Sequence, residues 1–315
     1  MLRPPGRRDF LRSLTGGAAG ISLFHSAFAA KARAQTGLAP LAVTRLTDTF
    51  LQITGAGSNV LAVIGTDSVL LVDGGLADRS AELLRLVGEH SGGKPVRVLF
   101  NTHWHPEHTG SNETLGQAGA KIVAHENTKL WLGAEFEVAW QKRTYEPRPK
   151  IALPNQTFYT TGKMTFGKEP IEYGYMLQAH TDGDIYVYFP GPNILVTGDV
   201  ASVGSYPVLD YSTGGWLGGL VEGQKTLLKV ANAETRIIPG DGALMTRADL
   251  QAENDMCNAV RERLVKLMRI GYGPKEMVAA APTKDFDEKW GNPELFILNA
   301  YRGLWGHVRE LGGIV

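Results

Sequence analysis

The chain has 315 residues, 43% of them hydrophobic, so it can bury a sizeable core as one large domain or two modest ones. Its 32 basic and 32 acidic residues form no basic stripe or acidic block, which argues against nucleic acid or an anionic membrane surface as a partner. The single cysteine, Cys257, excludes an intrachain disulfide. A compact enzyme acting on a small-molecule substrate fits this composition.

The first 34 residues have a different character from the rest. The stretch RRDFLRS contains Arg7 and Arg8, and an uncharged, mildly apolar run follows at residues 13–29. This arrangement resembles a twin-arginine export signal, with cleavage after Ala29 or Ala34. It predicts that residues 1–34 engage the twin-arginine export machinery and that the mature chain is periplasmic or otherwise exported. The alternative is an arginine pair in a disordered leader. Because the apolar run is marginal for a transmembrane helix, no stable membrane insertion is expected.

The next part of the chain reads as strands followed by alternating helices and strands. Stretches rich in β-branched residues predict strands within residues 43–53 and 59–72, the second broken by a GTDS turn. Leucines at helical spacing predict a helix at 79–89, which ends at a serine and two glycines. A strand at 96–101 and a helix-and-strand pair at 113–117 and 121–124 follow. The loop-rich segment 133–159 is expected to be an insertion over one face, with residues 140–154 facing the substrate.

The second half of the chain again reads as strands followed by helices. Strands are expected at 185–189, 194–196 and 235–238, with a helix from Leu217 to about residue 228. A longer helix is expected at 246–270, because Thr246 and Asp249 form a capping-box-like start. Cys257 lies on the apolar stripe of that helix and is therefore expected to be a core residue.

Two strand-rich halves, each followed by helices, predict the fold class. We expect an α/β protein built as a four-layer αββα sandwich of two mixed β-sheets flanked by helices. Its domain would cover residues 35–315, with a C-terminal helical part at about 246–315.

The sequence NTHWHPEHTGSN, at residues 101–112, carries the chemistry. An apolar strand, VRVLF, leads into His103 and His105 at alternate positions, and His108 follows three residues later at an expected helix start. Imidazoles at this spacing can converge on one or two cations. Gly110 permits close backbone approach where the chain turns. The sequence therefore predicts a metal site at the end of this strand.

Five motifs in order resemble those of the metallo-β-lactamase superfamily. They are DGG at residues 73–75, THWHPEHTGSN at 102–112, AHTDGD at 179–184, TGD at 197–199 and IIPGDG at 237–242. The resemblance covers roughly residues 40–250. It implies the αββα fold, with the metal centre at one edge between the two sheets.

Carried over to matching positions, the resemblance implies a set of ligands. The first metal would be held by His103, His105 and His180, and Asp199 would bridge to a second metal. The second metal would also be held by His108, Glu107 and Asp241. Asp73 would lie behind the site and orient a histidine or the loop. Asp184 would either do the same or cap a helix or turn.

Two of these positions depart from the family pattern. Glu107 stands where the family usually has aspartate, and Asp241 stands where it usually has histidine. The second site would then offer one nitrogen and three carboxylates, a set less favourable for zinc and more acceptable to manganese or iron. The expected cofactor is zinc, one or two ions, with manganese or iron in the second site. Asp241 has the further alternative of hydrogen-bonding its loop.

The resemblance also implies the reaction. The expected function is that of a metal-dependent hydrolase, in which a metal-bound hydroxide attacks an ester, lactone, amide or related bond of a small molecule. Asp199 is a catalytic residue through its place between the metals, and Glu107 is either a ligand or the general base for the attacking water. The alternatives are an iron-dependent oxidoreductase of the same fold and a non-catalytic metal-binding accessory protein. True β-lactamase activity is the less favoured reading within the hydrolases, because of the altered ligands.

Overall fold

The computed structural model describes residues 39–307. The chain divides into two units, Met1–Pro40 and Leu41–Val315, and the fold described below belongs to the second. The predicted export signal at residues 1–34 lies outside the described residues.

The first sheet has seven strands in the order β1-β2-β3-β4-β5-β6-β9. Its members pair antiparallel from β1 to β4 and parallel from β4 to β9, so the sheet is mixed. The central strands read VLAVI, VLLV and VRVLF and are buried almost throughout, as expected where both faces of a sheet are covered. The strands are β1 (Ala42–Arg45), β2 (Phe50–Thr54), β3 (Val60–Ile64), β4 (Val69–Val72), β5 (Val96–Phe100), β6 (Lys121–His125) and β9 (Gln156–Phe158).

The second sheet has five strands in the order β10-β11-β12-β13-β14. Three antiparallel pairs are followed by a parallel pair, β13 with β14. The strands are β10 (Thr161–Phe166), β11 (Glu169–Tyr175), β12 (Ile185–Phe189), β13 (Ile194–Gly198) and β14 (Arg236–Pro239).

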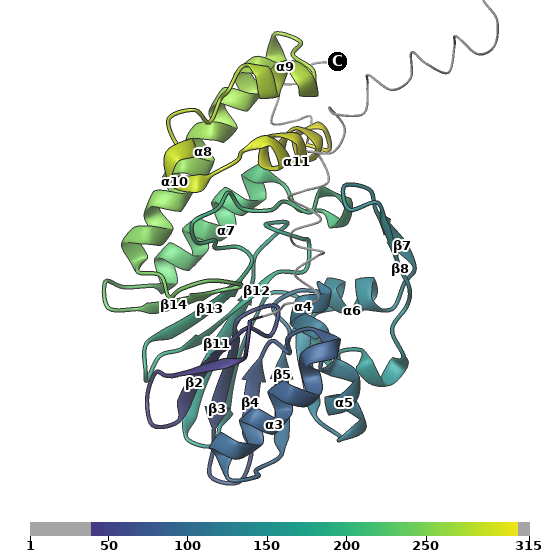
Figure 1. Cartoon of the computed structure of the whole chain (residues 1–315), viewed down its shortest axis with the longest axis vertical. Helices are drawn as coiled ribbons and strands as arrows, with labels where there is room; N and C mark the ends of the chain where they lie inside the picture. Colours follow the sequence, from purple (N-terminus) through teal and green to yellow (C-terminus); the bar gives the residue numbers. More distant parts are fainter. Residues whose placement is uncertain (1–38, 308–315) are drawn as a thin grey trace, which may run out of the picture. The chain divides into compact units, whose positions relative to one another are not determined.

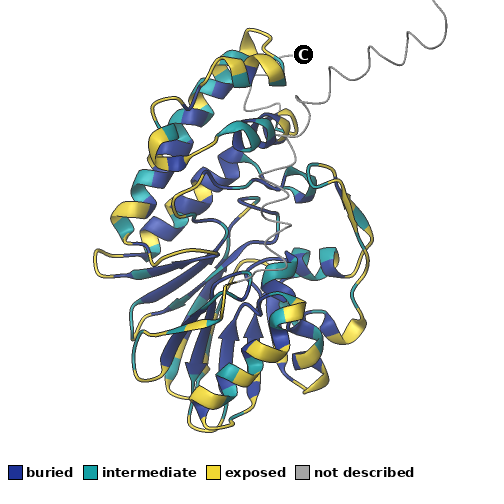
Figure 2. Ribbon diagram, viewed as in Figure 1, coloured by how far each residue is buried: buried dark blue, intermediate teal, exposed yellow. Residues whose placement is uncertain are grey.

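Helices cover the outer face of each sheet, and the two sheets face each other (Figure 1). One apolar cluster fills the space between the sheets, with Phe100 and Val187 among its members. A second packs α3 (Ser80–Ser91) and α5 (Asn112–Gln117) on the first sheet, and a third packs α7 (Leu217–Val230), α8 (Arg247–Arg269) and α11 (Glu294–Trp305) on the second. Figure 2 shows the inner strands of the sheets buried, between helices that expose their outer sides. The predicted αββα sandwich is confirmed.

The start of α8 shows how local sequence fixes a helix end. Thr246 accepts a hydrogen bond from the backbone of Asp249, whose side chain accepts one from the backbone of Thr246, which completes a capping box. Cys257 lies on the inner side of this helix and is buried, as predicted. Two shorter helices, α9 (Pro274–Ala279) and α10 (Asp287–Trp290), lie between α8 and α11.

The segment at residues 133–159 is more regular than its prolines and polar residues indicated. It contains the antiparallel pair of β7 (Phe136–Val138) and β8 (Arg143–Tyr145), which we call the β7–β8 hairpin, and it ends in β9, an edge strand of the first sheet. The short helices α4 (Pro106–Thr109) and α6 (Glu126–Leu132) lie beneath it (Figure 1). Strands β10 and β11 were not predicted, because their Gly, Lys and Glu residues obscure the alternation of a half-exposed hairpin.

Among the described residues, no helix combines the length and apolarity that a membrane span requires.

Candidate metal centre

The candidate site lies where strands of both sheets end. In the first sheet, Asp73 follows β4 and the His103 loop follows β5, and these two strands run parallel. In the second sheet, Asp199 follows β13 and Asp241 follows β14, which are also parallel. The carboxyl ends of parallel strands meet at one edge, so the motifs are gathered there although they lie up to 168 residues apart in the sequence.

Backbone hydrogen bonds join the two sheets at this edge. The amide of Ile185 donates to the carbonyl of Thr102 at 2.8 Å, and the amide of Asn59 donates to the carbonyl of Gly240 at 2.7 Å. The side-chain amide of Asn59 also donates to the carbonyl of Pro239 at 2.9 Å. The first bond ties the loop after β5 to the second sheet, and the other two tie the end of β14 and the loop after it to the first sheet, as a site with ligands from both sheets requires.

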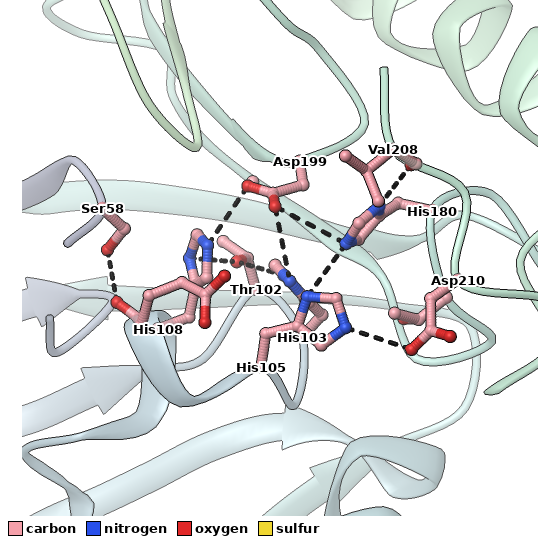
Figure 3. A network of polar contacts seen from close by, with 12 residues as sticks. Ser58, Thr102, His103, His105, His108, His180, Asp199, Val208 and Asp210 are labelled. Atoms are coloured by element: carbon pink, nitrogen blue, oxygen red, sulfur yellow. Dashed lines mark hydrogen bonds and ion pairs between the residues drawn. The ribbon is translucent and has the colours of Figure 1, made fainter. Parts of the chain in front are cut away.

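Four side chains converge, and each offers one ligand atom within 4.8 Å of the others: they are those of His103, His105, His180 and Asp199. Nε2 of His180 lies 3.1 Å from Nδ1 of His105 and 3.5 Å from Oδ2 of Asp199. Nε2 of His103 lies 3.9 Å from the same carboxylate oxygen (Figure 3). The three histidine side chains are 4% exposed or less, whereas that of Asp199 is 27% exposed, so the group opens to solvent on the aspartate side.

Hydrogen bonds behind the rings decide which nitrogens face the centre. Nδ1 of His180 lies 2.7 Å from the carbonyl oxygen of Val208, which can only accept, so Nδ1 carries the proton. Nε2 of His105 lies 3.1 Å from the carboxylate of Asp210 and donates to it in the same way. In the neutral rings, the two nitrogens that face each other at 3.1 Å are therefore both lone-pair donors. Only a shared proton or a metal cation can satisfy both.

The third histidine distinguishes these two cases. Nε2 of His103 is buried and has no hydrogen-bond partner. The hydroxyl of Thr102 donates to Asp73, so it accepts from Nδ1 of His103 at 3.1 Å, which leaves Nε2 as a lone-pair nitrogen aimed into the group. A buried polar atom without a partner is costly unless something else binds it. Three such nitrogens and a carboxylate form a donor set that fits a zinc-like cation.

The charge states also suit a metal ligand set. Burial, with a further contribution from the charge of His108, holds the pKa of His103 well below its usual value, and burial lowers the pKa of His180. For Asp199, burial would raise the pKa, but the charge of His108 dominates and holds it well below its usual value. The two rings are thus neutral and the carboxylate ionised near neutral pH, the forms that bind a cation. Burial opposes protonation of His105 too, but its bond to Asp210 raises its pKa overall, so a proton competes with a cation there.

His108 lies between two carboxylates. Its Nδ1 is 2.9 Å from Oδ2 of Asp73, and its Nε2 is 3.1 Å from Oδ1 of Asp199. Burial would lower the pKa of His108, but the charge of Asp73 raises it well above the usual value. Asp73 is itself buried, accepts hydrogen bonds from the backbone and hydroxyl of Thr102, and has a positive φ of 65°. Such a backbone is strained for a residue other than glycine and persists where surrounding contacts hold it.

Close backbone packing keeps the Asp199 carboxylate in place. A Cβ atom at Gly240 would lie 1.8 Å from Oδ1 of Asp199, so any larger residue would displace the carboxylate. Gly198, the residue before Asp199, has a φ of 54°, and a Cβ there would lie 2.7 Å from the hydroxyl of Thr102. At Gly110 a Cβ would lie 2.2 Å from the backbone nitrogen of Ala77, which explains why the turn after the histidine motif is glycine.

Three other expected site residues lie outside the four-residue group. Glu107 is half-buried, and its backbone carbonyl accepts a hydrogen bond from Ser58 at 2.6 Å. Asp241 is exposed, although the loop that carries it is held by Asn59. Asp184 is buried and accepts hydrogen bonds from the backbone and hydroxyl of Thr181, so it closes the turn after His180. The ligand roles of Glu107 and Asp241 therefore stay predictions.

One residue at the site was not anticipated from the sequence. Asp210 is fully buried, and besides His105 it accepts hydrogen bonds from Nε1 of Trp140 at 2.8 Å, from the hydroxyl of Thr213 at 2.7 Å and from the backbone of Ser212 at 3.2 Å. Trp140 lies between the two strands of the β7–β8 hairpin, so this aspartate links the hairpin to the metal site. The surrounding sequence, VLDYSTGG, offers no spacing or motif that marks the aspartate.

The fold and the cluster of histidines and aspartate together define the class of protein. The family model of the metallo-beta-lactamase superfamily matches residues 53–248, well over half of the chain, and the protein belongs to that superfamily.

Solved structures agree with this fold. A metallo-beta-lactamase from Pontibacter korlensis is 21% identical, with a TM-score of 0.58 over 70% of this chain and 99% of its own. The metallo-beta-lactamase DIM-1 is also 21% identical, with a TM-score of 0.56 over 70% of this chain and 98% of its own. The stereoselective inverting sec-alkylsulfatase Pisa1 from Pseudomonas sp. is 18% identical, with a TM-score of 0.66 over 83% of this chain and 50% of its own. At these identities the similarity establishes the fold alone.

Proposed function

We propose that the protein is a metal-dependent hydrolase that cleaves an ester, lactone, amide or related bond of a small molecule. The observation that carries the proposal is the set of three buried histidine nitrogens, on His103, His105 and His180, that face one point with no hydrogen-bond partner other than each other. Membership of the metallo-beta-lactamase superfamily supports the same conclusion.

The roles of the residues follow from their positions. His103, His105 and His180 would hold a cation, and Asp199, on the solvent side, would complete the set and face a second cation near His108. A metal bound there would supply an acidified water and an electrophile for the substrate oxygen. Zinc suits the three-nitrogen set best. The hydrogen bonds that His105 donates to Asp210 and that His180 donates to Val208 fix the ring orientations before the cation binds, which lowers the cost of binding.

Glu107 is the candidate general base. Burial has the largest effect on the pKa of both His105 and Tyr145, and the charge of Glu107 adds a smaller upward contribution to each, so its carboxylate lies within electrostatic reach of the site. The hydrogen bond from Ser58 holds its backbone next to His108. If Glu107 moves the proton, Glu107→Gln abolishes turnover and leaves the metal content unchanged, whereas a ligand role predicts loss of metal in the same variant.

The test combines metal content with activity. The mature chain, from Gln35 onward, is purified without added metal or chelator, and its metals are measured by elemental mass spectrometry. Activity is then measured on carboxylic esters, lactones, amides, a β-lactam and, because one structural neighbour is an alkylsulfatase, alkyl sulfate esters. Zinc with hydrolysis of one of these classes supports the proposal, and iron with no hydrolysis refutes it.

Matched variants connect the activity to the site. His103→Ala removes the unpartnered nitrogen and should abolish both metal retention and turnover. His90→Ala is the control, because His90 is an exposed histidine in the last turn of α3, which leads into the start of β5, whereas the motif follows the end of β5. Equal turnover in wild type and His103→Ala would exclude this site as the source of the activity.

We further propose that the chain is exported by the twin-arginine route. The support is the RRDFLRS stretch and the apolar run after it. Replacement of Arg7 and Arg8 by lysine should leave the protein in the cytoplasmic fraction, whereas the wild type is recovered from the periplasm. Recovery of both forms in the cytoplasm would refute this part of the proposal.

A further inference from the structure

A cavity of about 270 Å³ lies beneath the β7–β8 hairpin. Its floor is made by the loop and short helix that follow the first histidines, including Trp104, and by Trp131 of α6. Its outer wall is made by the hairpin and the residues after it, including Phe136, Arg143 and Tyr145. The segment had been expected to contact the substrate, and the structure shows that it encloses a space.

The aromatic walls of the cavity are packed against one another. The ring centroid of Trp104 lies 4.8 Å from those of both Phe136 and Tyr145, and Trp131 lies 4.7 Å from Phe136. These contacts are edge-to-face, the arrangement that aromatic pairs favour. Val138 is fully buried behind them and anchors the hairpin. The walls of the cavity are therefore rigid aromatic rings, and an aromatic ligand could pack against their edges and faces.

The polar part of the wall carries a net positive charge. Arg143 and Arg148 both line the cavity, against the single carboxylate of Glu146. The guanidinium of Arg143 lies over the ring of Tyr145 at 4.5 Å. In the part of the chain that the structure describes, neither arginine forms an ion pair with an acid. A guanidinium without a carboxylate partner at the rim of an apolar cavity is a ready binding group for an anion.

We propose that this cavity is a binding site for a small aromatic anion, with the ring between the tryptophans and the carboxylate on Arg148. The volume supports this choice, because a cavity of about 150 Å³ holds a benzene ring and this one leaves space for a second ring or a carboxylate. Binding sites for small molecules commonly combine apolar walls with a few polar groups in this way.

The site is separate from the metal centre but adjacent to it. The cavity is lined by neither Asp199 nor the metal-site histidines, yet the ring of Trp104 lies 4.4 Å from that of His105. One side chain thus separates a bound anion from a ring of the metal site. The proposal does not depend on the hydrolase activity, because binding is measured without turnover.

The experiment is isothermal titration calorimetry on the metal-loaded mature protein with 1-naphthoate and, as a neutral probe of similar shape, 1-naphthalenemethanol. We expect 1-naphthoate to bind and the alcohol to bind at least about tenfold more weakly, because a hydrogen bond to a charged group is lost. Arg148→Gln should lower the affinity for 1-naphthoate by a similar factor. Arg97→Gln, an exposed arginine on β5 outside the cavity, should leave it unchanged.

Two further variants separate the possible outcomes. Thr144→Trp places a bulky ring at an exposed lining position and should block binding, even if Arg148→Gln alters the fold. His103→Ala should still bind 1-naphthoate, since none of the expected metal ligands lines the cavity. No binding at millimolar probe, equal binding of both probes, or binding that is lost with His103→Ala and kept with Arg148→Gln would each overturn the proposal.

Discussion

Asp210→Asn should move the ring proton of His105 from Nε2 to Nδ1 without replacing any of the expected metal ligands. The two oxygens of Asp210 accept from four donors: Oδ1 from Trp140 and the Ser212 backbone, and Oδ2 from His105 and Thr213. An asparagine amide cannot replace Oδ1, because the indole and the backbone amide can only donate. The amide nitrogen must therefore face His105, whose Nε2 has to become the acceptor. The proton then moves to Nδ1, the nitrogen that faces His180 at 3.1 Å.

This exchange converts a metal ligand into a hydrogen-bond donor. To bind a cation, Nδ1 of His105 must give up its proton and Nε2 must carry it instead. The N–H of Nε2 would then face the amide N–H of the introduced asparagine, so two donors would face each other. Groups that orient metal-bound histidines in this way contribute about 10- to 100-fold to metal affinity, or about 1.4 to 2.7 kcal/mol. We expect Asp210→Asn to lower the metal affinity by about 100-fold or more, because the substitution enforces the tautomer of His105 that cannot bind a cation.

The assay is competition with a chromophoric chelator at constant pH, with long-range ¹H–¹⁵N NMR of the metal-free protein to read which nitrogen of His105 is protonated. Asp182→Asn is the matched control: Asp182 also accepts from an indole, Nε1 of Trp131 at 2.6 Å, but contacts no metal-site histidine. Metal affinity within threefold of wild type in Asp210→Asn, or an unchanged tautomer, would refute the reasoning.

Four other substitutions test metal binding and stability. His180→Ala should remove the metal and lower turnover at least about 100-fold, measured by metal analysis and initial rates. Glu253 is fully buried, and burial raises its pKa to about 8, so its neutral form stabilises the native state below pH 4.5 and this contribution is lost as the pH rises through 8. The free energy of unfolding of the wild type should fall with rising pH by at most about 1.4 kcal/mol per pH unit on account of this group, and Glu253→Gln should remove that dependence. Urea unfolding between pH 5 and 9 measures it, and an unchanged dependence on pH in the variant would contradict the prediction. Gly240→Ala should displace Asp199 and weaken metal binding, whereas Gly88→Ala, in open space on α3, should raise stability by about 0.5–1 kcal/mol by thermal unfolding.

The layers of the fold were predictable because they rest on local patterns. The strand VLLV before Asp73 is apolar throughout, and the strand VRVLF before His103 is apolar except for the exposed Arg97. Each strand leads into a motif. The gathering of these motifs at one edge was implied by the resemblance to the metallo-β-lactamase superfamily, and the parallel pairing of the strands explains it. The capping box at Thr246 likewise depends only on two residues three apart.

The contacts behind the ligands were not predictable in the same way. Asp210 reaches His105 from 105 residues away, and Val208 contributes only a backbone carbonyl, which carries no sequence signal. The β7–β8 hairpin was interpreted as a loop because its strands are three residues long and half-exposed, too short for a period to show. Its order comes from the aromatic cluster beneath it rather than from strand propensity.

The hydrogen bond between Trp140 and Asp210 has a thermodynamic consequence for the whole hairpin. Asp210 is held in position by the indole on one side, and it holds His105 in position on the other. Any cation that stabilises this orientation of His105 also favours the docked hairpin, and by reciprocity anything that binds under the hairpin and steadies Trp140 favours the cation to the same degree. Binding under the hairpin and binding of a cation at the histidines would thus be coupled through a single carboxylate, with no movement of the two sheets.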